Sequence, residues 1–165
     1  MVREAREEDK QHAARIFAES FTGSWRYWSL RLLDVLKLLV AEVGGKVVGA
    51  AELYTTEVKE YGKVGVVSFI AVEKGFRGRG VGRKLLEAAE RFFAEEGCAY
   101  AAASTRSDNE ASLALFRSLG YELHWRSSKV FEKLEAPVPP ALPQPFPALA
   151  AREPLHTTHP VAKPV

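Results

Sequence analysis

The segment Arg77–Lys84 constrains the fold of this chain more than any other part of the sequence. It follows Val64–Val72, which is rich in β-branched residues, and it leads into Arg83–Glu96, where apolar residues recur at helical spacing. Glycines at alternate positions of the segment let the backbone approach a ligand closely. These are Gly78, Gly80 and Gly82. A strand, a glycine-rich turn and a helix in this order bring unpaired amides and the positive end of the helix dipole together, which predicts an anion-binding turn.

The turn is also rich in positive charge. Its cations are Arg77, Arg79, Arg83 and Lys84. Cations at the start of a helix are mildly unfavourable because the helix dipole is positive there, so a bound anion, most naturally a phosphate, would offset them. A P-loop needs Gly-Lys-Ser/Thr and a dinucleotide-binding turn needs G-x-G-x-x-G, whereas this turn reads G-x-G-x-G. The sequence thus favours another kind of phosphate site, and the alternative is a solvated loop that happens to contain Arg and Gly.

The first 135 residues alternate strand-like and helix-like segments, as in an α/β or α+β domain. The clearest hairpin surrounds Gly44-Gly45, since paired glycines accept the positive φ of a tight turn. The predicted strands are Val2–Ala5, Leu38–Val43, Lys46–Glu57, Val64–Val72 and Ala99–Ser104, with a closing hairpin over Tyr121–Leu134. The predicted helices are Glu7–Phe21, a second one after Gly23-Ser24, Arg83–Glu96 and Asn109–Leu119.

Proline usage predicts a boundary, because all nine prolines lie between Pro137 and Pro164. Proline cannot donate to a sheet ladder or continue a helix, so we expect a domain over residues 1–135 and a Pro-rich C-terminal tail over residues 136–165. A net charge of +2 argues against nucleic-acid binding, and no apolar run near the start indicates secretion or a membrane span. A single cysteine, Cys98, rules out an internal disulfide and is expected to be a small buried side chain. A cytoplasmic location is expected.

The turn matches the signature Gln/Arg-x-x-Gly-x-Gly/Ala through Arg77, Gly80 and Gly82. Together with Phe69–Val72 before it and Asn109–Phe116 downstream, it resembles the GNAT superfamily of N-acetyltransferases, and the likeness extends over residues 1–134. The resemblance implies an α/β (α+β) fold with a mixed, mostly antiparallel central sheet of six to seven strands flanked by about four helices. It also implies acetyl-CoA (CoA) as the cofactor.

The resemblance further implies a set of cofactor-binding residues. The backbone of Ile70, Ala71 and Val72 would pair with the pantetheine arm. The pyrophosphate would be held by Arg77, Gly78, Arg79, Gly80, Val81, Gly82, Arg83 and Lys84. Asn109 would face the pantetheine, Arg117 would meet the nucleotide phosphate, and Phe116 completes the set. Asn109 also stands at a helix start, where its side chain can serve as a cap, and both roles can coexist.

The catalytic groups depart from the family pattern. Many relatives carry a proton-donating tyrosine at the position of Phe116, and phenylalanine cannot donate that proton. Two strand positions where relatives often place a base are occupied by Val66 and Ser104, and neither acts as a base at neutral pH. The transfer chemistry must therefore use other groups.

The remaining candidates lie on neighbouring strands. Glu52, acting through a water, is the candidate base, with His124 as a weaker one. Tyr54 or Tyr121 is the candidate acid for the departing thiolate, and water is the alternative. The resemblance to the GNAT superfamily implies an N-acetyltransferase that moves an acetyl group from acetyl-CoA to a primary amine by direct attack in a ternary complex. The alternative is a catalytically weak or inactive CoA-binding module with a sensing or partner-binding role.

The acceptor is expected to be a small-molecule amine or a protein amine. Trp25, Tyr27 and Trp28, placed in the loop between the first two helices, would line its cleft, with core packing as the competing role. His156 and His159 are too few ligands for a metal site, so no metal is expected. No nucleic-acid or membrane partner is expected, and a homodimer stays open.

Overall fold

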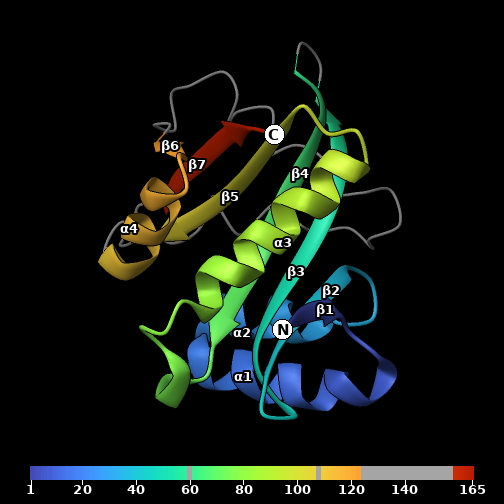
Figure 1. The fold of residues 1–165 in the computed structure, drawn as a ribbon, viewed down its shortest axis with the longest axis vertical. Coiled ribbons are helices and arrows are strands. Elements are labelled where there is room, and N and C mark those ends of the chain that lie inside the picture. The colour runs from blue at the N-terminus through green and yellow to red at the C-terminus, as the bar shows by residue number, and fades with distance from the viewer. Residues whose placement is uncertain (59–60, 107–108, 124–157) are drawn as a thin grey trace. The chain divides into compact units, whose positions relative to one another are not determined.

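The computed structural model describes residues 1–58, 61–106, 109–123 and 158–165 (Figure 1). The chain divides into two compact units: unit 1 comprises Met1–Tyr54 and Val67–Phe92, and unit 2 comprises Thr55–Val66 and Phe93–Val165. Two long strands, β3 (Lys46–Val58) and β4 (Gly62–Val72), each contribute residues to both units.

In unit 1 the strand order is β1-β2-β3-β4. Strand β1 (Val2–Glu4) pairs with β2 (Lys37–Val43), and β2 pairs with β3, both antiparallel. The turn between β2 and β3 has Gly44 at φ +58° and Gly45 at φ +77°, a conformation that glycine adopts without strain. The hairpin predicted from this glycine pair is therefore confirmed.

Three α-helices belong wholly or mostly to unit 1: α1 (Lys10–Ser20), which follows the 3₁₀ turn η1 (Glu7–Asp9), α2 (Gly23–Arg31) and α3 (Val81–Glu95). Helix α1 buries Ala13, Ile16 and Phe17, the spacing of one helical face. Helix α3 approaches β3 closely at Gly49, where an added Cβ would lie 3.0 Å from Cδ1 of Leu85. Leu85 is completely buried, so the missing side chain of Gly49 makes room for a core residue of the helix.

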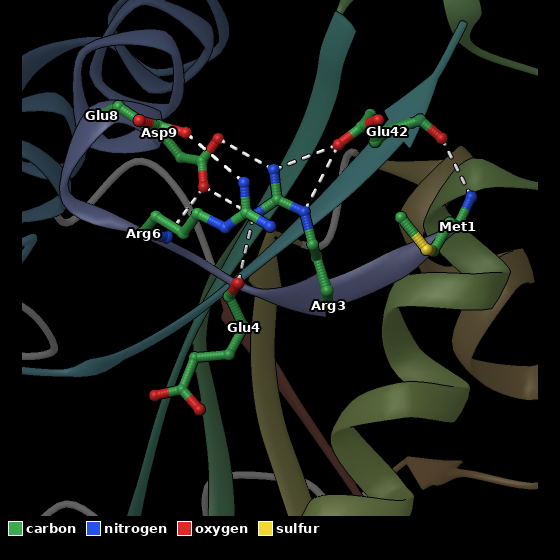
Figure 2. A network of polar contacts seen from close by, with 7 residues as sticks. All are labelled: Met1, Arg3, Glu4, Arg6, Glu8, Asp9 and Glu42. Carbon is green, nitrogen blue, oxygen red and sulfur yellow. Dashed lines mark hydrogen bonds and ion pairs between the residues drawn. The ribbon is translucent and has the colours of Figure 1, made fainter. Parts of the chain in front are cut away.

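An ion-pair network centred on Arg3 fixes the start of unit 1 (Figure 2). The Arg3 guanidinium contacts the two carboxylate oxygens of Asp9 at 2.6 and 3.1 Å, and Oε2 of Glu42 at 3.0 Å. Asp9 is buried and also accepts from the backbone N–H of Arg6 at 2.7 Å. The Arg3 guanidinium holds the pKa of the Asp9 carboxyl below its usual range. Because these residues come from β1, η1 and β2, the network sets where α1 begins.

In unit 2 the strand order is β3-β4-β5-β7-β6. Its further elements are β5 (Tyr100–Arg106), α4 (Glu110–Ser118), β6 (Glu122–Leu123) and β7 (Thr158–Pro164). A core cluster is formed by Val58, Val64, Ala102 and Ala162. Beside it, Gly65 of β4 accommodates the ring of Phe93, since an added Cβ would lie 2.2 Å from ring atoms.

Strand β7 lies within the predicted Pro-rich tail over residues 136–165. Thr158–Pro164 pairs with β5 from Arg106 to Tyr100 and also with β6, so this part of the tail is a sheet strand. The N–H of Val165 donates to the Ala99 carbonyl, so it points toward β5. Because successive backbone nitrogens of a strand point alternately to either side, the nitrogens of Pro160 and Pro164 point away from β5. Both prolines thus occur where β5 needs no donor, which is how a strand tolerates them.

The predicted fold class is confirmed. Among the described residues there are seven strands and four α-helices, and the β1–β2, β2–β3, β5–β7 and β6–β7 pairs are antiparallel. Most of the predicted hairpin over Tyr121–Leu134 lies outside the described residues, and β6 pairs with β7. In the described part of the chain, no helix is long and apolar enough to cross a membrane.

Candidate functional site

The turn between β4 and α3 has the geometry of an open anion site. After the 3₁₀ turn η2 (Lys74–Phe76), Gly78 and Gly80 adopt φ of +71° and +78°, and an added Cβ at either would meet no atom within 4 Å. The N–H of Lys84 donates to the Gly80 carbonyl at 3.1 Å and so makes the first i to i−4 bond of α3. The amides of Val81 and Gly82 come before this ladder and are oriented outward from the helix end.

The cations of the turn are exposed, as an anion site requires. Arg77, Arg79, Arg83 and Lys84 all have exposed side chains. Arg79 lies over the Phe76 ring, 5.5 Å from its centroid, and Arg83 lies 3.7 Å from Glu87 one helical turn later. An anion at the helix start would therefore meet accessible positive charge and backbone donors together.

Contacts within unit 1 anchor the turn at its entrance. Nε of Arg77 donates to the Val72 carbonyl at 2.8 Å, and Nη2 donates to Oγ of Ser20 at 3.3 Å. The Glu73 carboxylate contacts Lys46 at 2.9 Å and Arg15 at 3.6 Å. Ser20, Lys46 and Arg15 could not be predicted from the sequence, because no local pattern connects them with a turn so far along the chain.

The residues predicted to pair with the pantetheine arm, Ile70–Val72, lie at the end of β4. Ile70 and Val72 are half-buried, whereas Ala71 between them is buried, as expected for alternate faces of a strand. Next to them, Phe69 contacts two aromatic rings edge-on, Phe21 at 5.5 Å and Trp25 at 5.9 Å between ring centroids. The end of β4 is therefore packed against the segment where α1 ends and α2 begins.

Glu52 is a completely buried carboxyl group on β3. It lies three residues after Gly49, so its side chain points to the face of β3 opposite α3, beside its cross-strand partner Leu38. Neither carboxylate oxygen has a hydrogen-bond partner within the described residues. Burial raises the pKa of Glu52 to about 9, and it also raises the pKa of Tyr54, two residues along the same strand face, to about 12. Both groups therefore carry their protons at neutral pH.

The three aromatic residues predicted to line the acceptor cleft lie on helix α2, which corrects the predicted loop. Thr22 is extended and α2 begins at Gly23, so the helix starts before the aromatic residues. Trp25 is half-buried against Phe69, whereas Tyr27 is 56% exposed and meets Trp28 edge-on at 5.1 Å. The helix separates their roles, because Trp25 packs on the strand and Tyr27 faces solvent.

In unit 2, the side chain of Asn109 caps helix α4. Its Oδ1 accepts from the Ser112 N–H at 3.1 Å, the arrangement expected of an N-cap, and its Nδ2 is not part of that bond. Phe116 is 1% exposed and Tyr121 is 3% exposed, and their rings lie 5.0 Å apart at 67°. Arg117 is exposed. The structure thus brings the buried rings of Phe116 and Tyr121 together and leaves Arg117 accessible.

The other singled-out residues have mostly structural surroundings. Val66 packs against the core cluster of unit 2, and Ser104 lies on β5 opposite Pro160. Cys98 is buried, and burial raises the pKa of its thiol, which suits an inert apolar side chain. His124 and His156 lie outside the described residues. Within the ranges that the structure describes, no cluster of His, Cys, Asp and Glu could hold a metal ion.

Comparison with known proteins places these features in a family. The sequence matches the acetyltransferase (GNAT) family over residues 2–121. The fold is similar to that of an IAA acetyltransferase from Bacillus cereus, with a TM-score of 0.68, 16% identity, and coverage of 100% of this chain and 99% of that one. It is also similar to a ribosomal-protein-alanine N-acetyltransferase from Brucella melitensis, with a TM-score of 0.66, 21% identity and coverage of 100% and 99%. An aminoglycoside N-acetyltransferase in complex with CoA matches with a TM-score of 0.63, 22% identity and coverage of 74% and 87%.

Proposed function

This chain belongs to the acetyltransferase (GNAT) family, and from that membership we propose that it transfers an acetyl group from acetyl-CoA directly to a primary amine. The observation that carries the proposal is the open turn between β4 and α3, where exposed cations surround the start of a helix. CoA supplies the acetyl group as a thioester and carries a pyrophosphate that fits this turn. A similar fold has been solved with CoA bound.

The residues present fit the cofactor in charge and in space. We propose that the backbone amides from Arg79 to Arg83, which come before the first hydrogen bond of α3, bind the pyrophosphate, while the side chains of Arg79 and Lys84 offset its charge. The open space at Gly78 and Gly80 lets the phosphates approach the backbone. The backbone from Ile70 to Val72 would hold the pantetheine arm. The roles of Asn109, Phe116 and Arg117 in unit 2 stay predictions.

The chemistry requires a neutral amine, a stabilised oxyanion and a proton for the leaving thiolate. The amine nitrogen forms a bond to the acetyl carbon, the carbon–sulfur bond breaks, the nitrogen loses a proton and the sulfur gains one. We propose that the Val72 amide stabilises the oxyanion. With pKa values of about 9 and about 12, Glu52 and Tyr54 are suited to donate a proton at neutral pH rather than to accept one. This reverses the role predicted for Glu52, and Tyr121 stays the alternative donor.

The acceptor is proposed to be a primary amine on a small molecule or a protein. The names of similar structures include both kinds, an aminoglycoside N-acetyltransferase and a ribosomal-protein-alanine N-acetyltransferase. The exposed Tyr27 and its neighbour Trp28 are the proposed acceptor contacts of α2, whereas Trp25 is proposed to support them from the strand side. Thiol release from acetyl-CoA with a panel of both amine types would identify the class.

Calorimetric titration with CoA tests the cofactor site. Gly80→Val should abolish binding, because a bulky side chain at φ +78° distorts the turn and fills the space over it. Gly44→Val is the matched control, since Gly44 also has a positive φ and open space but lies in the β2–β3 turn. Failure of the unmodified protein to bind CoA at micromolar concentration, or equal binding by both variants, would overturn the proposed site.

A further inference from the structure

The Arg77 side chain joins two elements of unit 1. Nε donates to the carbonyl of Val72, the last residue of β4, at 2.8 Å, and Nη2 donates to Oγ of Ser20, the last residue of α1, at 3.3 Å. One guanidinium therefore ties a strand end to a helix end across 57 residues of sequence. Two of its donors are committed to the protein itself.

The peptide group between Val72 and Glu73 is hydrogen-bonded on both sides. Its oxygen accepts from Arg77, and its N–H donates to the Val48 carbonyl at 2.8 Å. The Glu73 side chain is held as well, by Lys46 and Arg15. The direction in which the chain leaves β4 and enters the turn is thus determined by contacts that involve no ligand.

We propose that Arg77 is a positioning residue, which sets the end of β4 and the path of the turn, and that the phosphates are bound by the amides and cations that follow it. This inference rests on the proposed function, and it revises the sequence-based assignment of the Arg77 side chain to the cofactor. According to this proposal, CoA binding depends on the hydrogen bond from Nε of Arg77 to the Val72 carbonyl and does not depend on the positive charge of Arg77.

Glutamine is the other residue that the turn signature accepts. Its side chain can donate the same hydrogen bond but carries no positive charge. Nε2 of glutamine is separated from Cα by the same number of bonds as Nε of arginine, so it can reach the Val72 carbonyl from position 77. The ammonium of lysine is one bond farther out and keeps the charge. If CoA binding depends on the hydrogen bond, Arg77→Gln should therefore bind CoA more tightly than Arg77→Lys. If it depends on the positive charge, the order should be reversed.

The test is calorimetric titration with CoA of the unmodified protein, Arg77→Gln and Arg77→Lys. We expect Arg77→Gln to bind within about threefold of the unmodified protein, and Arg77→Lys to bind about tenfold more weakly, since a misplaced strand end loses roughly one hydrogen bond of stabilisation. Thermal unfolding of both variants, which alter an exposed side chain, reports whether each is folded.

Arg79→Ala is the comparison variant, because Arg79 is a proposed phosphate contact whereas Arg77 is a proposed positioning residue. It should weaken CoA binding and reduce the dependence of Kd on salt, whereas Arg77→Gln should leave that dependence unchanged. Tighter binding by Arg77→Lys than by Arg77→Gln would make Arg77 a phosphate ligand and overturn the inference. Equal effects of the two variants would also overturn it. Absence of CoA binding by the unmodified protein would instead contradict the proposed function on which the inference rests.

Discussion

At the scale of residues, Glu52 couples folding to protonation. The side chain is completely buried on β3 and its oxygens have no partner among the described residues, so the neutral form is favoured. Its pKa is about 9 in the folded protein, against an ordinary value of 4.5. Between those pH values the folded state binds the proton and the unfolded state does not. The free energy of unfolding should therefore fall as the pH rises through this window, by up to about 1.4 kcal/mol per pH unit.

Glu52→Gln should remove most of this pH dependence, because glutamine has the same shape and cannot ionise. At pH 8 we expect the variant to be more stable than the unmodified protein by about 1–3 kcal/mol. Urea unfolding at pH 5.5 and at pH 8 measures the difference. Glu57→Gln, an exposed substitution on the same strand, serves as the control and should leave the pH dependence unchanged. A slope in Glu52→Gln as steep as in the unmodified protein would contradict the assignment.

At the scale of elements, β7 shows that a proline-containing segment can complete a sheet. Its two prolines have their nitrogens on the side away from β5, so the β5–β7 ladder keeps its donors. Ala162, between them, is 6% exposed and belongs to the core cluster of unit 2 with Val58, Val64 and Ala102. The strand therefore contributes to the core as well as to the sheet.

Ala162→Asp should destabilise the protein by about 3 kcal/mol or more, since it buries a carboxylate without a partner. Thermal unfolding followed by circular dichroism should show a Tm lower by roughly 6–12 °C. Val165→Asp, at a position that is 38% exposed, is the matched control and should have little effect. If residues 158–165 were a solvated tail, the two substitutions would be equally harmless, and that outcome would refute the role of β7.

At the scale of the whole molecule, the charge of the turn contrasts with that of the chain. The net charge is only +2, yet four cations gather within Arg77–Lys84, and each of them is exposed. Binding of a polyanion there adds its free energy to that of folding, because the unfolded chain offers no helix start and no ordered turn. Cofactor binding and global stability are thus expected to rise together.

Acetyl-CoA at about a hundred times its Kd should stabilise the protein by about 2.7 kcal/mol and raise the Tm by roughly 5–10 °C. The shift should shrink in 0.5 M NaCl, since exposed charges are screened. Pantetheine, which lacks the phosphates, is the control ligand and should give a much smaller shift at the same concentration. Equal shifts from the two compounds would mean that the turn does not bind the phosphates.

The sequence by itself determined the features that are encoded locally. The hairpin at Gly44-Gly45, a helix following the glycine-rich turn and the cap of α4 by Asn109 each depend on residues within a few positions of one another, although α3 begins at Val81 and not at the predicted Arg83. Such patterns can be read directly, because φ preferences, helix periodicity and capping act over one or two turns of chain. The family signature of the turn is local for the same reason.

Only the tertiary structure decided the features that depend on distant partners. The place of β7 follows from its pairing with β5, the protonation of Glu52 follows from its burial, and the contacts of Arg77 follow from the position of Ser20. Strand pairing, desolvation and long-range hydrogen bonds depend on which segments meet in space, and no local pattern of proline, glutamate or arginine specifies that. The strand–turn–helix unit was thus readable in the sequence, whereas the contacts of Arg77 required the fold.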